Sequence, residues 1–121
     1  MEKLEVFGAN KLRGHVKISG SKNASLPILV ATLLSEKPIY LNNIPNVKDI
    51  GTMLSLLSYL GSKIKTNKKK HLLEINNSKI SKILAPYNLV KTMRAGILLL
   101  GPLLARFNKA TVSFPGGCLI G

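Results

Sequence analysis

The sequence is short of several residue types, and each shortage excludes a class of protein. One cysteine among 121 residues rules out an intramolecular disulfide framework. Beside Cys118 there are only His15 and His71, at no spacing typical of metal ligands, so we expect no metal and no cofactor. No apolar run approaches the ~20 residues of a membrane span, and the amino terminus lacks the apolar core of a signal peptide. We therefore expect a cytosolic protein with no membrane partner.

Acidic residues are also few: five Asp and Glu stand against eighteen Lys and Arg, for a net charge of +13. Such a chain can attract nucleic acid, acidic lipid or anionic metabolites. The one dense basic run, 68–70, follows Thr66-Asn67 and is typical of a solvated hairpin turn. It lacks the interleaved aromatics and the motif of nucleic-acid readers. We expect no nucleic-acid partner, and keep a small basic nucleic-acid-binding module as the weakest alternative.

Apolar residues are abundant and make up 45% of the chain, which predicts a globular fold. The length of 121 residues allows one domain at most. Strand and helix patterns alternate, which predicts an α/β or α+β fold that begins β-α-β-α-β-β. A polar linker is expected over 76–87. The expected helices cover about 23–34, 47–60 and 89–104, the expected strands cover 4–7, 15–18, 38–41 and 110–114, and a hairpin joins 63–66 to 71–75.

Three short runs are candidates for chemistry, and the first is Gly20-Ser21-Lys22-Asn23. It leads from an expected strand into an expected helix, so backbone donors, the helix dipole and the Lys22 ammonium could meet at one phosphate or carboxylate. The run lacks the full spacing of a phosphate-binding loop. A lysine facing solvent at a helix start is the alternative.

The second run, Lys91-Thr92-Met93-Arg94, comes near the start of the apolar helix expected over 89–104. Arg94 would lie at the edge of the core, where a guanidinium needs an acidic partner, carbonyl groups or a ligand. A surface arginine that extends from that edge into solvent is the equal alternative.

The third run is Pro115-Gly116-Gly117-Cys118, which follows an expected strand. Two glycines beside a thiol permit unusual backbone angles and close approach of a ligand. An isolated cysteine is usually a small buried hydrophobe. Its place after Gly-Gly, outside any periodic apolar pattern, favours a functional thiol.

From end to end, the chain resembles the UDP-N-acetylglucosamine 1-carboxyvinyltransferase family. The most specific parts are Ser19 to Ala24, Ala85-Pro86-Tyr87 with Leu89 to Ala95, and Pro115 to Cys118 with Ile120-Gly121. The resemblance implies an inside-out α/β barrel built from βαβαββ repeats, here one repeat plus part of a second. It also implies transfer of the enolpyruvyl group of phosphoenolpyruvate to the 3-hydroxyl of UDP-N-acetylglucosamine, the first committed step of peptidoglycan synthesis.

The resemblance assigns roles to four residues. Lys22 and Asn23 match positions that hold phosphoenolpyruvate and the sugar nucleotide, and Arg94 matches a sugar-nucleotide-binding arginine. Cys118 matches the mobile-loop cysteine, the general acid for the enol carbon and the target of fosfomycin. The related shikimate-pathway enzyme lacks this glycine-cysteine loop, so Cys118 favours the sugar-nucleotide branch.

The resemblance also implies that this chain is the amino-terminal part of such an enzyme. The carboxylate expected as base, and further substrate-binding arginines, would lie beyond Gly121. We expect residues 1–21 to be strands that pack in the other domain, and 22–121 to be an incomplete catalytic domain. We therefore expect the piece to be inactive alone and to need a carboxyl-terminal remainder. The alternative is a degenerate fragment without catalysis.

Overall fold

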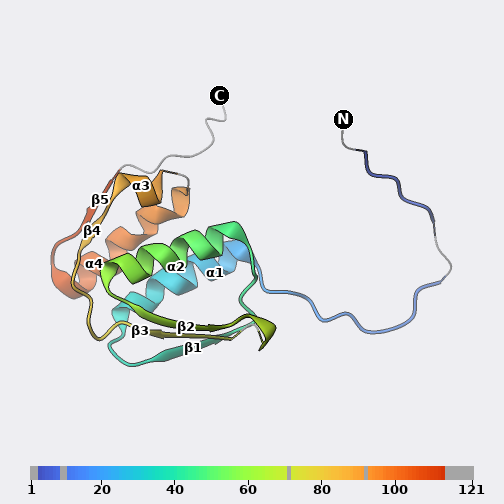
Figure 1. Cartoon of the computed structure of the whole chain (residues 1–121), viewed down its shortest axis with the longest axis horizontal. Helices are drawn as coiled ribbons and strands as arrows, with labels where there is room; N and C mark the ends of the chain where they lie inside the picture. Colours follow the sequence, from blue (N-terminus) through green and yellow to red (C-terminus); the bar gives the residue numbers. More distant parts are fainter. Residues whose placement is uncertain (1–2, 9–10, 71, 92, 114–121) are drawn as a thin grey trace.

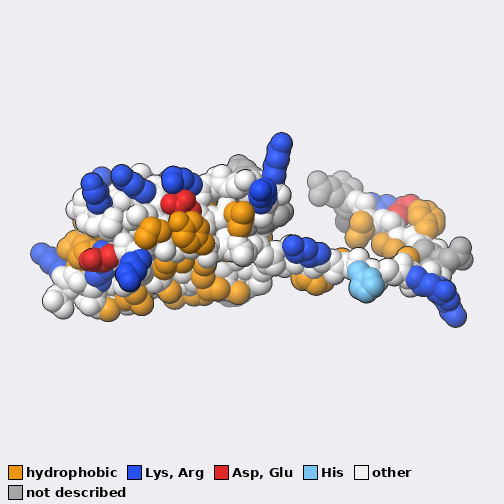
Figure 2. Space-filling model, turned by 90° about the horizontal axis from the view of Figure 1, so that it is seen from below, with side chains coloured by type: hydrophobic (Ala, Val, Ile, Leu, Met, Phe, Trp, Pro, Cys, Tyr) orange, Lys and Arg blue, Asp and Glu red, His pale blue; other side chains and the backbone are white. Residues whose placement is uncertain are grey.

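The structure is a computed structural model that describes residues 3–8, 11–70, 72–91 and 93–113. Residues 3–8 and 11–20 form an extended arm that leads away from the packed body (Figure 1). The strands expected over 4–7 and 15–18 are therefore absent. Their apolar side chains alternate but stay exposed, for example Leu4 at 90% and Val16 at 85%. Figure 2 shows such hydrophobic side chains on the surface of the arm. A lone strand cannot satisfy its backbone groups, so the alternation alone does not make a sheet.

The body begins with helix α1 (Lys22–Ala31), which continues as the single 3₁₀ turn η1 (Thr32–Leu34). Together they confirm the helix expected over 23–34. Pro27 lies inside α1, beyond the first turn, so the helix lacks the hydrogen bond that an N–H at this position would donate to the Asn23 carbonyl oxygen. Leu26, Leu29, Val30 and Leu33 form the buried face.

Helix α2 (Lys48–Leu60) confirms the amphipathic helix expected over 47–60. Its buried side chains recur at spacings of three and four, from Ile50 and Met53 to Leu57 and Leu60. The helix ends at Gly61, whose φ of 117° is a conformation that favours glycine. A Cβ there would also lie 2.6 Å from the carbonyl oxygen of Lys79.

Three antiparallel strands form the main sheet, in the order β1-β3-β2. Strand β1 (Ile39–Asn42) confirms the strand expected over 38–41. Strands β2 (Lys63–Asn67) and β3 (Leu72–Asn76) form the expected hairpin, in which Ile64 faces Ile75 and Asn67 faces Leu72. The basic run Lys68–Lys70 forms the 3₁₀ turn η2 between them. Helices α1 and α2 lie on one side of this sheet (Figure 1).

The last third differs from the single helix expected over 89–104. A short helix α3 (Tyr87–Val90) is followed by the 3₁₀ segment η3 (Arg94–Leu99) and by α4 (Leu100–Phe107). The extended backbone of Met93 (φ −142°, ψ 107°) separates α3 from η3. Regular α geometry starts at Leu100, where Pro102 falls in the first turn and removes no intrahelical hydrogen bond. Apolar periodicity did not reveal these breaks.

A second, two-stranded sheet closes this region. Strand β4 (Leu84–Ala85) pairs in parallel with β5 (Thr111–Val112). β5 confirms the start of the strand expected over 110–114, whose last residue lies outside the described residues. β4 was not expected, because residues 76–87 were interpreted as a polar linker. A two-residue strand is too short to show an alternating pattern.

One core joins these elements, and its members are buried leucine, isoleucine, valine, alanine and methionine side chains from both helices, the sheet and the last third. In the part of the chain that the structure describes, no helix is long and apolar enough to cross a membrane. The fully buried large apolar side chains are Leu29, Leu33, Met53, Leu56, Leu57, Leu60, Ile75, Leu99, Leu103, Val30 and Val90.

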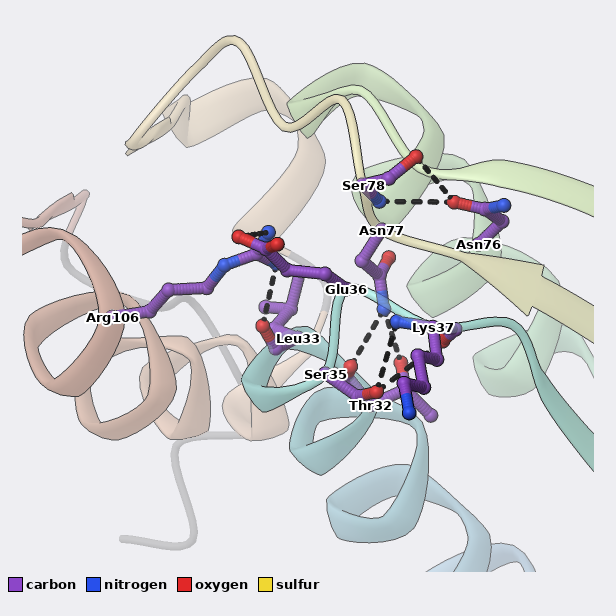
Figure 3. Close-up of polar contacts among 9 residues, drawn as sticks. All are labelled: Thr32, Leu33, Ser35, Glu36, Lys37, Asn76, Asn77, Ser78 and Arg106. Carbon is purple, nitrogen blue, oxygen red and sulfur yellow. Dashed lines mark hydrogen bonds and ion pairs between the residues drawn. The ribbon is translucent and has the colours of Figure 1, made fainter.

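A polar network holds the carboxyl end of the α1–η1 unit (Figure 3). The fully buried Asn77 donates from Nδ2 to the carbonyl oxygen of Thr32 (2.7 Å) and to its Oγ1 (3.1 Å), and accepts a hydrogen bond from Ser62 (2.6 Å). Arg106 donates from Nη1 to the carbonyl oxygen of Leu33 at 2.8 Å. Arg106 thus supplies a donor to the Leu33 carbonyl oxygen at this helix end, and Asn77 adds a second donor to the Thr32 carbonyl oxygen, which also accepts from the Ser35 N–H at 3.0 Å.

Candidate functional site

The candidate site is built around the amino end of α1, whose entry is shaped by Gly20. The Gly20 N–H donates to Asn43 Oδ1 at 3.1 Å, and Asn43 Nδ2 donates to the carbonyl oxygen of Ile18 at 3.4 Å. A Cβ at position 20 would lie 1.8 Å from the Asn43 carbonyl oxygen. Only glycine therefore lets the chain pass Asn43 closely enough to enter the helix here.

Ser21 is the amino-terminal cap of α1. Its Oγ accepts a hydrogen bond from the Ala24 N–H at 3.4 Å, and its carbonyl oxygen accepts the first intrahelical bond from Ser25 at 2.9 Å. The N–H groups of Lys22 and Asn23 precede that first bond and remain available to solvent or to a ligand. The end of the helix therefore offers two backbone donors.

Lys22 points toward the start of the second helix. Its Nζ lies 2.8 Å from Oδ2 of Asp49, which stands in the first turn of α2. Since α1 and α2 pack together and the pair joins their first turns, the helices run parallel and start at the same edge of the body (Figure 1). Both side chains remain open to solvent, with Lys22 47% and Asp49 39% exposed.

The electrostatics of this edge favour an anion. The amino end of each helix carries the positive pole of its dipole, and the two poles are brought together here. Helix α2 starts after Val47 with no side-chain cap, so its first N–H groups also have no side-chain acceptor. The Lys22 ammonium adds a full positive charge. Such an arrangement can bind a phosphate or carboxylate, with Asp49 as its one neighbouring negative charge.

Arg94 lies in a neighbouring segment. It opens η3, which packs against α1, and its side chain is exposed, whereas the preceding Met93 and the following Gly96 are buried. The position agrees with the expectation that Arg94 would lie at the edge of the core. The structure therefore places Lys22 and Asn23 together on the first turn of α1, and Arg94 on a segment in contact with that helix.

Cys118 and the whole run 115–118 lie outside the described residues. Within the described residues, no group of three or more His, Cys, Asp and Glu side chains could hold a metal ion.

An apolar hollow of about 130 Å³ lies beside the start of α2, between the β1–α2 connection and the hairpin. None of its lining residues is charged, so it does not suit a phosphate ligand. The residues that line it are Ile44, Pro45, Asn46, Val47, Ile50, Gly51, Leu54, Thr66, Asn67, Leu72 and Leu73.

Two residues of this edge were not anticipated from the sequence. Asn43 braces Gly20, and Asp49 pairs with Lys22. Asn43 has a positive φ of 58°, which Asn tolerates better than most residues, so the Asn42-Asn43 pair was a turn signal. Asp49 carried the signal of an acidic residue at a helix start, a common stabilising feature that does not by itself indicate a partner lysine.

Comparisons with known proteins find one matching family and several similar relatives. The family model described as EPSP synthase (3-phosphoshikimate 1-carboxyvinyltransferase) matches residues 6–121. A UDP-N-acetylglucosamine 1-carboxyvinyltransferase of Pelagibacter ubique is 68% identical over all 121 residues, and those of Saccharophagus degradans and Coxiella burnetii are 52% and 53% identical over the same length. The chain spans 28 to 29% of the length of these relatives.

A comparison of folds gives a related result. The crystal structure of the enolpyruvyl transferase NikO from Streptomyces tendae superposes on 85% of this chain with a TM-score of 0.71, and 24% of that protein is covered. The sequence identity is 21%, so this likeness concerns the fold. It confirms the expected mixed α/β architecture as a portion of an enolpyruvyl transferase fold.

Proposed function

The chain belongs to the EPSP synthase family, and from this premise we propose that it contributes to a UDP-N-acetylglucosamine 1-carboxyvinyltransferase. The proposed reaction moves the enolpyruvyl group of phosphoenolpyruvate to the 3-hydroxyl of UDP-N-acetylglucosamine and releases phosphate. The observation that carries the proposal is Lys22, held 2.8 Å from Asp49 where two helix amino ends meet, in a chain 68% identical to a relative of that name.

The choice of the sugar nucleotide as acceptor rests on two observations. Relatives that are 52 to 68% identical over the full chain carry that name. The run Gly116-Gly117-Cys118 matches the cysteine loop of the sugar-nucleotide branch and distinguishes it from the shikimate branch. Such an enzyme would act in the cytoplasm, at the first committed step of peptidoglycan synthesis.

In the proposed mechanism, Lys22 and Asn23 bind the anionic groups of phosphoenolpyruvate. The ammonium of Lys22 and the two unbonded N–H groups of the first turn suit oxygens that carry negative charge. Arg94, on the adjacent η3, suits the diphosphate of the sugar nucleotide, because a guanidinium can donate two parallel hydrogen bonds to phosphate oxygens.

The chemistry proceeds by addition and then elimination. The sugar hydroxyl oxygen bonds to the central carbon of phosphoenolpyruvate while the methylene carbon takes a proton, for which Cys118 is the proposed general acid. The resulting tetrahedral intermediate loses a proton from the new methyl group and expels phosphate, which restores the double bond. The residue that removes the sugar hydroxyl proton is not among those described, and we propose that the remainder of the enzyme supplies it.

Alkylation of Cys118 tests the proposal. Fosfomycin would be incubated with the chain, with and without UDP-N-acetylglucosamine, and the product examined by mass spectrometry. We expect a single adduct on Cys118 that forms faster with the sugar nucleotide, because a bound sugar nucleotide would complete the site in which fosfomycin binds. Iodoacetamide serves as the control for simple exposure of the thiol. A fosfomycin rate that the sugar nucleotide does not change would contradict a working sugar-nucleotide site in this chain.

A further inference from the structure

The Lys22–Asp49 ion pair joins two residues of which only one has a role in the proposed function. Asp49 lies in the first turn of α2, where its negative charge is stabilised by the positive end of the helix dipole. That stabilisation does not require Lys22. Its Oδ2 nevertheless lies 2.8 Å from the Lys22 ammonium, which spans from the start of one helix to the start of the other.

Two consequences follow from this geometry. The flexible side chain of Lys22 is held at the shared edge of the helices, instead of sampling solvent. Its charge is also already balanced by a carboxylate, so an incoming anion must share or replace Asp49 as the partner of Lys22. Exposures of 47% and 39% leave both atoms within reach of a dissolved anion.

The other ion pairs in the described part of the chain do not share this arrangement. Lys65 and Glu74, 3.3 Å apart, lie on the two strands of the hairpin, where Lys65 is 80% exposed. Arg106 pairs with Glu36 at 3.2 Å beside the end of η1. Neither lies at the start of a helix. Among the described ion pairs of the packed body, Lys22 and Asp49 alone connect two helix amino ends.

We propose that Asp49 is a positioning residue and internal counter-ion. It holds the Lys22 ammonium where the two helices begin, and the substrate anion replaces its carboxylate as the partner of Lys22 when it binds. The inference rests on the proposed function, since it concerns the same anion site. In this role Asp49 lowers the intrinsic affinity of the site for any small anion. A phosphate ion makes no further contacts that could offset this loss of affinity. It is therefore disfavoured relative to a substrate that contacts several groups of the site.

The experiment measures binding of inorganic phosphate by NMR, from the amide signals of Lys22 and Asn23 at constant ionic strength. Freeing the Lys22 ammonium from its carboxylate partner predicts about three- to tenfold tighter binding of phosphate by Asp49→Asn. Glu74→Gln is the matched control, because it changes the net charge by the same amount on the sheet. We expect its phosphate affinity to stay within about twofold of the parent chain.

A double-mutant cycle shows whether Asp49 acts through Lys22. In the Lys22→Met background, Asp49→Asn should improve phosphate affinity less than about twofold, because the competition for the ammonium is gone. Asp49→Glu retains the charge and should bind phosphate like the parent, which keeps the test valid if the asparagine variant folds poorly. An unchanged or weaker affinity in Asp49→Asn, an equal gain in Glu74→Gln, or a gain that persists without Lys22 would each overturn the inference.

The outcome is separable from that of the proposed function. If Asp49→Asn and the parent bind phosphate equally while fosfomycin still modifies Cys118 in a sugar-dependent way, the inference fails and the proposed function stands. If Asp49→Asn gains affinity but the sugar nucleotide has no effect on alkylation, Asp49 is the counter-ion of an anion site and the proposed acceptor is wrong.

Discussion

Asn77 gives the most quantitative prediction about the fold. Its side chain is fully buried, and its amide nitrogen donates to the carbonyl oxygen and hydroxyl of Thr32 (Figure 3). Its amide oxygen accepts a hydrogen bond from the hydroxyl of Ser62. In Asn77→Ala the Ser62 hydroxyl loses its acceptor and a small cavity replaces the amide. The Thr32 carbonyl oxygen keeps the Ser35 N–H at 3.0 Å, and the Thr32 hydroxyl keeps the Leu29 carbonyl oxygen at 2.7 Å. An unsatisfied buried group costs about 1 to 3 kcal/mol. With one such group and the cavity, we expect the free energy of unfolding to fall by about 2 to 4 kcal/mol.

The neighbouring Asn76 supplies the matched control. Its Oδ1 accepts hydrogen bonds from the N–H and the hydroxyl of Ser78, at 2.9 and 2.7 Å, on the solvent side of the chain. Water can replace those bonds, so Asn76→Ala should cost about 1 kcal/mol or less.

Urea unfolding followed by far-UV circular dichroism would measure both variants. With a slope of about 1 to 3 kcal/mol per molar urea, Asn77→Ala should move the midpoint down by about 2 M, and Asn76→Ala by far less. Equal losses in the two variants would refute the reasoning, because they would mean that the buried network contributes no more than an exposed turn.

Three further predictions concern the same body and are read from the same urea midpoints. Gly20→Ala should cost about 1 to 2 kcal/mol, because the new Cβ would displace the arm from Asn43, while Gly8→Ala, with open space around it, should cost nothing measurable. Arg106→Ala should cost about 1 to 2 kcal/mol, since the Leu33 carbonyl oxygen loses the guanidinium that donates to it; an alanine variant as stable as the parent would contradict this. Leu57→Ala, at a fully buried position of α2, should cost about 2 to 5 kcal/mol, and a loss below 1 would argue against the described core.

The elements with a strong local pattern were the ones that the sequence predicted well. Helix α2 was recognisable from Ile50, Met53 and Leu57 at helical spacing and from Gly61 as its stop. The hairpin was recognisable because alternating residues flank a polar turn. In these segments the residues that decide the structure are neighbours along the chain.

What the sequence did not reveal depends on contacts between distant residues. The pairing of β4 with β5 joins Leu84 to Thr111, and neither short segment has a period of its own. The break at Met93 falls between two apolar stretches, and the extended backbone there has no sequence signal such as proline or glycine at that position. The alternation in the arm predicted strands, but strands need partners, and the described residues contain none for the arm.

The site shows the same division between local and distant information. Lys22 and Asn23 were found from the run that starts the helix, and the structure puts them on its exposed first turn. Asp49 was missed, because its importance arises only when α1 and α2 pack in parallel and bring their first turns together. The roles that the resemblance assigns to Lys22, Asn23, Arg94 and Cys118 all remain predictions.

The central claim is that Lys22 forms the anion site for phosphoenolpyruvate, and calorimetric titration of this substrate tests it most directly. The parent chain would be compared with Lys22→Met and with Lys63→Met, which removes the same charge from the exposed start of β2. Loss of one charged hydrogen bond predicts at least about tenfold weaker binding for Lys22→Met and a change within about twofold for Lys63→Met. Equal weakening in both variants, or no saturable binding to the parent chain, would contradict the account.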